Sequence, residues 1–296
     1  MTMEPIKDQT NLQDLVDPVL LTAFTSEVKG GHTATSALAY ALGQWNARLV
    51  AEFDADEYYI NARMRPWLRR DGDKTVIDWP QNLVYRVDAP ERTVLILVGV
   101  EPSLNWRRFV AKIGEFAAEH DVKLAVNIKS VPATVPHTLE LPVRAIYSQP
   151  ELQEKFAIAQ LDDQDGPADI GRVLNLHLAS QGIPAIDVYA MEPFYAAAMP
   201  DAEAGILLLR ALEHAFDLPV DTSQLEQTAA AQRLAIDAVV ERSEELRQTV
   251  HALEQRAQAT ALLAAPEAGP SDLDAAAVLD EAEEFLRSLR PDDSAA

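Results

Sequence analysis

Three residues whose side chains can transfer protons follow predicted strands. Glu101 comes directly after an apolar run, Glu192 follows a second one, and His137 lies in a loop after a third. Paired carboxylates, or a carboxylate with a histidine, can perform acid–base catalysis. In open parallel sheets, ligands bind at the turns that follow the strands. A structural interpretation competes: the carboxylates accept hydrogen bonds from loop amides or pair with Arg107 or Arg108, and backbone hydrogen bonds hold the histidine. We favour the structural interpretation.

Two other kinds of site have weaker signals. Gly30 and Gly31 precede a predicted helix and follow a predicted strand, and Lys29 lies beside them. That layout presents backbone amides to an anion, but it matches neither a Walker loop nor a Gly-x-Gly-x-x-Gly fingerprint. The six histidines show no metal-ligand spacing, so we expect no metal and no cofactor. Ser103 lacks a Gly-x-Ser-x-Gly elbow, and we interpret it, or Asn105, as a helix cap.

The element that positions Glu101 is a predicted strand–helix–strand unit. Residues 93–98 form an unbroken, β-branched apolar run, which is typical of a strand buried on both faces. A polar turn leads to a predicted helix over 104–120, with Phe109, Ile113 and Phe116 on one stripe. A second apolar strand is predicted over 123–128.

The rest of the first 218 residues alternates in the same way. Strands are predicted over 19–24, 48–53, 142–148 and 186–190, and helices over 32–45, 167–181 and 201–216. Residues 54–89 differ, since they contain short alternating pieces at 58–60, 75–79 and 83–87 and a hairpin turn at Asp71-Gly72. We read them as an antiparallel insertion. The fold class predicted is a three-layer α/β/α sandwich with a mixed, mainly parallel sheet.

The ends of the chain are predicted to be different from this core. Residues 1–17 are expected to be a flexible arm, and residues 18–218 the core domain. A long helix is predicted over 221–258, with an apolar stripe interrupted at Ser243. A linker over 259–271 and a short acidic helix over 272–289 complete the chain. A helix of that length needs a surface to cover its stripe, so we expect it to pack on the core or on another subunit.

Composition excludes several classes of function. The 296 residues include 48% hydrophobic ones, which is enough for a sizeable core, and the net charge is −22. This acidity argues against nucleic-acid binding, which needs clustered Lys and Arg. The chain has no cysteine, so disulfides and thiolate sites are excluded. There is no apolar run long enough to span a membrane and no secretory signal. We expect a cytoplasmic protein with no nucleic-acid or membrane partner.

Several short motifs occur together in an order that is similar to a known family. They are Arg65-Pro66, Trp79-Pro80, Glu101-Pro102-Ser103 with Trp106 and Phe109, Pro136-His137-Thr138, and Gly182-Ile183-Pro184. The chain resembles an actinobacterial-type member of the proteasome assembly chaperone two family, also described as ATP-grasp-like proteins of unknown function. The resemblance covers residues 15–218. It implies a fold like that of purine nucleoside phosphorylases, a homo-oligomer such as a trimer, and proteasome-related partners. In the first loop only Gly31 clearly matches the family's pattern.

The sequence therefore predicts a non-enzymatic, homo-oligomeric binding protein of the assembly-chaperone type. The alternative is a nucleoside phosphorylase-like or hydrolase-like enzyme that uses Glu101 and His137. The candidate pocket residues are Gly30, Gly31, Glu101, Trp106, His137 and Glu192.

Overall fold

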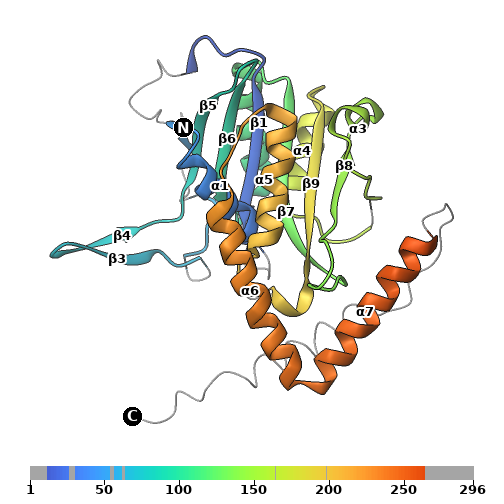
Figure 1. Cartoon of the computed structure of the whole chain (residues 1–296). Helices are drawn as coiled ribbons and strands as arrows, with labels where there is room; N and C mark the ends of the chain where they lie inside the picture. The colour runs from blue at the N-terminus through green and yellow to red at the C-terminus, as the bar shows by residue number, and fades with distance from the viewer. Residues whose placement is uncertain are drawn as a thin grey trace.

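A seven-stranded sheet with the strand order β2-β5-β6-β1-β7-β9-β8 forms the centre of the molecule (Figure 1). The computed structural model describes residues 12–26, 31–53, 57–61, 64–163, 165–197 and 199–263. The four central strands pair in parallel, whereas β5 is antiparallel to both β2 and β6, and β8 is antiparallel to β9. The strands are β1 (Val19–Thr25), β2 (Arg48–Phe53), β5 (Asn82–Asp88), β6 (Thr93–Val100), β7 (Leu124–Ala133), β8 (Val143–Tyr147) and β9 (Ala185–Pro193). The predicted mixed, mainly parallel sheet is confirmed.

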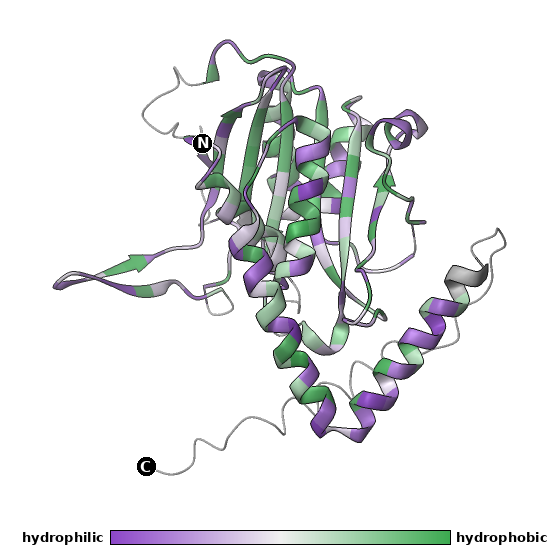
Figure 2. Cartoon of the chain, viewed as in Figure 1, coloured by the Kyte–Doolittle hydropathy of each residue, from purple (hydrophilic) through white to green (hydrophobic). Residues whose placement is uncertain are grey.

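Helices cover both faces of the sheet, which completes the predicted three layers. On one face α1 (Thr33–Leu42), α3 (Pro150–Phe156) and α5 (Ala202–Phe216) pack on alternate strand residues such as Leu21. On the other face α2 (Trp106–Glu119) and α4 (Ile170–Ser180) pack on residues such as Leu20. Because successive side chains of a strand point to opposite faces, each central strand must be apolar at nearly every position. Figure 2 shows these strands as largely hydrophobic.

The central unit shows how the sequence produces this arrangement. Residues Thr93 to Leu97 of β6 are all buried. In α2, five apolar residues recur at spacings of three and four, so they lie on one stripe of the helix, and all five are buried (Phe109, Val110, Ile113, Phe116 and Ala117). Asn105 is the N-cap of α2, but its side chain donates to the carbonyl of Glu57 and does not cap the helix. The predicted side-chain cap is therefore wrong.

Several predicted boundaries are wrong where a neighbouring strand extends the pairing. Both β7 and β9 continue into segments predicted as loops, since Pro132 pairs with Glu192 and Ala133 with Pro193. Residues 58–60 are not a strand: Tyr58 is buried against Phe109, so its hydrophobicity reflects packing and not sheet pairing.

One helix prediction needs correction, and one helix lies where the sequence favours no element. The segment 149–161, which is ambiguous in the sequence, contains α3. The helix predicted from residue 167 begins at Ile170, because Asp169 accepts a hydrogen bond from the backbone amide of Arg172 and so caps α4.

A two-stranded ribbon stands apart from the main sheet. It consists of β3 (Trp67–Asp71) and β4 (Lys74–Asp78), which pair only with each other among the described strands. The predicted turn at Asp71-Gly72 joins them, and Gly72 adopts a positive φ of 59° that favours glycine there. Figure 1 shows the ribbon projecting away from the body of the molecule.

The single long helix predicted over 221–258 is two helices in the structure. The first, α6 (Ser223–Arg242), lies along α5, and the second, α7 (Glu244–Leu263), turns away from it (Figure 1). Ser243 has the extended conformation φ −118°, ψ 115°, and its hydroxyl accepts from the backbone amide of Leu246. A serine that caps the next helix therefore ends the first one.

Several predictions for the two ends of the chain concern residues that the structure does not describe. Residues 1–11 of the expected arm, most of the expected linker, and the expected acidic helix over 272–289 lie outside the described residues. Within the part of the chain that the structure describes, no helix is both long and apolar enough to cross a lipid bilayer.

Candidate functional site

Glu101 is positioned at the carboxyl edge of the sheet, as its place after β6 predicts. Its Oε1 atom lies 3.1 Å from the backbone nitrogen of Ile170 and accepts that hydrogen bond at the start of α4. Asp169 pairs with Lys129 on β7 at 3.0 Å. These side chains line a cavity of about 10 Å³, which is room for about one water molecule. Glu101 therefore bridges two elements, and the cavity beside it is too small for a metabolite.

A buried polar cluster lies behind this edge, on the face covered by α2 and α4. Asp187 of β9 is fully buried and accepts hydrogen bonds from Arg172, Asn127 and Asn175, at 3.0, 3.2 and 2.9 Å. Burial raises the pKa of the Asp187 carboxyl, and the ion pair with Arg172 opposes that rise. Gly171 makes room for this cluster, since a Cβ atom there would come within 2.3 Å of the Asn127 side chain.

The cluster was not predicted from the sequence, although one signal was present. Asp187 is a charged residue inside the apolar run 186–190, and a fully buried charge needs partners. Those partners come from α4, the helix just before β9, and from Asn127 of β7, which lies 60 positions earlier in the chain. The cluster ties β7, α4 and β9 together.

Glu192 lies on the opposite face of the sheet from the Asp187 cluster, near the start of α1. It is fully buried, and its Oε2 atom accepts from the hydroxyl of Thr33 at 3.0 Å. The same hydroxyl accepts from the backbone amide of Asp201. Burial raises the pKa of the Glu192 carboxyl to about 7, and the hydrogen bond from Thr33 opposes the rise. Glu192 and Glu101 thus contact different helices on different faces, and they do not form a carboxylate pair.

His137 is buried and joins the loop after β7 to the C-terminal helices. The hydroxyl of Tyr195 accepts from the backbone amide of His137 at 2.8 Å and lies 2.7 Å from its Nδ1 atom. The Nε2 atom lies 2.9 Å from a carboxylate oxygen of Asp237 on α6. The carbonyl of His137 accepts two hydrogen bonds from the guanidinium of Arg233, also on α6.

These contacts engage both nitrogens of the imidazole. The Nδ1 atom is within hydrogen-bond distance of the Tyr195 hydroxyl, and the Asp237 carboxylate accepts a hydrogen bond from Nε2. His137 therefore connects the loop after β7 to α6.

Of the remaining pocket candidates, Trp106 and Gly31 also make internal hydrogen bonds. The indole nitrogen of Trp106 donates to the carbonyl of Pro102 and closes the turn before α2. Gly31 accepts a hydrogen bond from the backbone amide of Ser26 across the first loop. Gly30 lies outside the described residues. Among the residues that are described, no group of three or more His, Asp or Glu side chains is arranged to hold a metal ion.

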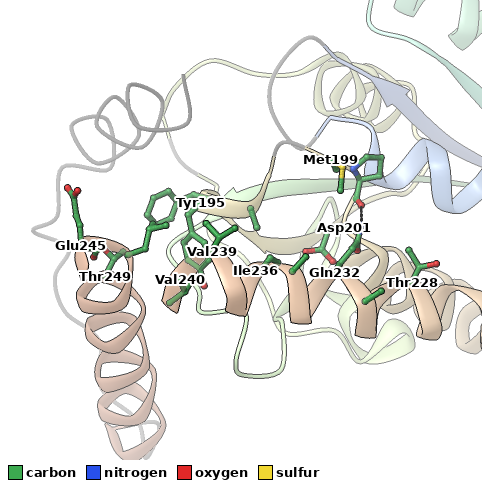
Figure 3. A pocket seen from close by; sticks show the side chains of 16 residues that line it. Tyr195, Met199, Asp201, Thr228, Gln232, Ile236, Val239, Val240, Glu245 and Thr249 are labelled. Atoms are coloured by element: carbon green, nitrogen blue, oxygen red, sulfur yellow. Dashed lines mark hydrogen bonds between the residues drawn. The ribbon is translucent and has the colours of Figure 1, made fainter. Parts of the chain in front are cut away.

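An apolar groove is a further feature of the described part of the structure. It lies between the segment after β9 and the two C-terminal helices, and has a volume of about 540 Å³. Its wall includes Phe194, Tyr195, Ile236, Val239, Val240 and Leu246 (Figure 3). Asp201 and Gln232 line the end of the groove beside α5, and Glu245 lines the end beside α7 (Figure 3). Neither Glu101 nor His137 lines it, so the groove is not a site for the predicted acid–base pair.

Comparison with known proteins identifies the family. The model of the PAC2 family matches residues 27–240. The chain belongs to the PAC2 family. This confirms the resemblance inferred from the motifs, since the matching structures include proteasome-assembly chaperone homologues. No curated protein matches the chain at a significant level.

Several solved structures are similar to this chain in fold. A PAC2 family protein from Streptomyces avermitilis is 29% identical, with a TM-score of 0.70, over 79% of this chain and 100% of that one. A proteasome-assembly chaperone homologue from Mycobacterium tuberculosis is 28% identical, with a TM-score of 0.69, over 78% and 99% of the two chains. PbaB from Pyrococcus furiosus, an archaeal proteasome activator, is 16% identical with a TM-score of 0.62 over 76% and 94%, which shows a common fold alone.

Proposed function

We propose that this protein is a non-enzymatic, homo-oligomeric binding protein with an assembly-chaperone-like role. The observation that carries the proposal is the groove of about 540 Å³, whose wall is built mainly from apolar side chains of helices. A surface of that kind suits an apolar protein segment, whereas sites for small polar metabolites need convergent polar groups. The proton-transfer candidates Glu101, His137 and Glu192 are each engaged in internal hydrogen bonds instead.

The family relationship indicates the kind of partner. The Mycobacterium tuberculosis relative is named a proteasome-assembly chaperone homologue, and it is similar over nearly its whole length. We therefore propose proteasome subunits as the partners of this protein, and a trimer as its own assembly. We also propose that the protein acts in the cytoplasm. The absence of cysteine is compatible with that reducing compartment.

Binding to purified proteasome α and β subunits tests this function. The full chain should retain the subunits on an affinity column, and the complex should survive high salt, because apolar contacts are not screened by ions. A parallel screen against nucleosides and their phosphorylated forms should show no turnover. Failure to bind either subunit would contradict the chaperone role, and nucleoside turnover abolished by Glu101→Gln would establish an enzyme in its place.

A further inference from the structure

The β3–β4 ribbon exposes more apolar surface than its size explains. Trp67, Leu68, Ile77 and Trp79 are 74%, 66%, 50% and 51% exposed. Together they present on the order of 500 Å² of apolar surface, whereas a stable interface takes about 800 Å² from each partner. A two-stranded ribbon is also marginally stable on its own. Both features indicate that the ribbon is completed by a contact with another surface.

Apolar side chains lie on both faces of the ribbon. Paired residues of an antiparallel ladder share a face, so Leu68 and its partner Ile77 lie on one side. Trp67 and Val76 belong to the neighbouring pairs and lie on the other side. A flat partner surface would cover only one of these faces. A groove can cover both.

The same chain contains an apolar groove that no described segment fills. Val239 and Met199 on its wall are exposed despite their size. Figure 1 shows the ribbon and α7 pointing to opposite sides of the molecule, so the ribbon of one chain does not enter its own groove. A contact between the ribbon of one copy and the groove of a second copy joins two different surfaces, so it is heterologous. The second copy can then place its own ribbon in the groove of a third copy, and the series ends when a ring closes.

Charge favours this pairing of surfaces. Residues 67–78, which form the ribbon, carry three cations and three carboxylates, so the ribbon is neutral in a chain whose net charge is −22 (Arg69, Arg70 and Lys74 against Asp71, Asp73 and Asp78). Arg70 lies on the same face as Leu68 and has no ion-pair partner among the described residues. Glu245 lines the groove beside α7 (Figure 3). The ribbon is therefore much less acidic than the chain as a whole, and its Arg70 is suited to an acidic surface of a second copy.

We propose that the β3–β4 ribbon of one copy inserts into the groove between the β9–α5 segment and α6–α7 of a second copy. Leu68, Ile77 and the flanking tryptophans fill the groove, and Arg70 pairs with Glu245. The inference deepens the homo-oligomer part of the proposed function, and it names the two surfaces that form the contact.

Engineered cysteines test the contact directly, because the natural chain has none. The double variant Leu68→Cys/Val239→Cys should form a ladder of disulfide-linked species under mild oxidation, seen on a non-reducing gel. Each single variant should stay monomeric on that gel, since the contact does not join identical residues. The control is Leu176→Cys/Val239→Cys, in which the first cysteine replaces an exposed leucine of α4 outside both surfaces.

Three outcomes of this experiment would overturn the proposal. They are a double variant that links no more than the control, dimers in either single variant, and a disulfide within one chain. Sedimentation velocity of the unmodified chain shows which proposal has failed. If the unmodified chain is oligomeric but the double variant forms no disulfide ladder, only the ribbon–groove contact is contradicted. If the unmodified chain is a monomer, the proposed homo-oligomer is contradicted as well.

Charge reversal gives a second, independent test. Arg70→Glu and Glu245→Arg should each shift the assembly toward smaller species in sedimentation velocity. Combining the two reversals should restore the parent distribution, because the ion pair is rebuilt in the opposite sense. Single variants that sediment like the parent would overturn the proposed pairing.

Discussion

Removing the carboxylate of Asp237 should loosen the attachment of α6 to the core. This carboxylate accepts a hydrogen bond from Nε2 of His137, whose side chain is 5% exposed, while the Asp237 side chain is 45% exposed. In Asp237→Ala the buried N–H of His137 loses its acceptor. A buried donor without a partner costs about 1–3 kcal/mol, and we expect the lower end, about 1 kcal/mol, because water can approach from the exposed side.

Two matched variants make this prediction specific to the hydrogen bond. Asp237→Asn keeps an oxygen that accepts from Nε2 and removes only the charge, so it should be within a few tenths of a kcal/mol of the parent. Glu241→Ala removes an exposed carboxylate one turn further along α6 and should be equally mild. The expected order of destabilisation is therefore Asp237→Ala first, with the other two variants close to the parent.

Amide hydrogen exchange of α6 and thermal unfolding measure the effect. For a chain of this size, about 1 kcal/mol corresponds to a fall in melting temperature of roughly 2–4 °C, and the α6 amides should exchange faster in the same variant. Two results would refute the reasoning. If Asp237→Ala matches Glu241→Ala, the hydrogen bond contributes nothing, and if Asp237→Asn is as damaging as Asp237→Ala, the charge of Asp237 and not its role as an acceptor is what stabilises α6.

Three further predictions concern buried positions and a helix junction. Glu192→Gln should stabilise the protein more at pH 8 than at pH 5 in urea unfolding, by up to roughly 3 kcal/mol. The pKa of Glu192 is about 7 in the native state, above its value in the unfolded chain. The parent protein therefore loses stability as the pH rises from the unfolded pKa to the native pKa, and it stays less stable at higher pH. If Glu192→Gln changed the free energy of unfolding equally at pH 5 and pH 8, this reasoning would be contradicted. Gly171→Ala should cost about 1–3 kcal/mol through overlap with Asn127, while Gly166→Ala, which has open space, should be neutral. Ser243→Ala should lower the melting temperature, since it removes the cap of α7, worth about 1 kcal/mol; a rise would indicate that a continuous helix is preferred.

Local pattern was sufficient to predict the elements of the central layer. The run from Thr93 and the stripe of α2 carry their own periodicity, so strand and helix type followed from spacing alone. The errors lie where a remote partner decides the outcome. β7 and β9 extend each other past their apolar runs through Pro132 and Pro193, and neither proline marks a strand when the sequence is read alone.

The candidate site was predicted less well because its contacts are long-range. Glu101 was placed correctly at the carboxyl edge of the sheet, but the amide that it binds is that of Ile170, at the start of α4, so this bond is made neither with a loop amide nor with Arg107 or Arg108. Asp237, the partner of Nε2 of His137, lies a hundred positions away on α6. No sequence pattern around Asp237 indicates that it contacts this loop.

The groove depends on the direction in which α7 leaves α6. The helical periodicity of the sequence predicts the helices but not the angle between them.

The break at Ser243 connects the stability of the C-terminal helices to the binding surface. A continuous helix from Ser223 to Leu263 would extend about 60 Å at 1.5 Å per residue and carry its last turns away from the core. With the break, α7 returns so that Val250 and Leu253 pack on Phe194 and Tyr195. The same turn places Leu246 and Glu245 on the wall of the groove. Any partner that fills the groove therefore also covers the joint that holds α7, so binding and docking of the helices must be thermodynamically linked.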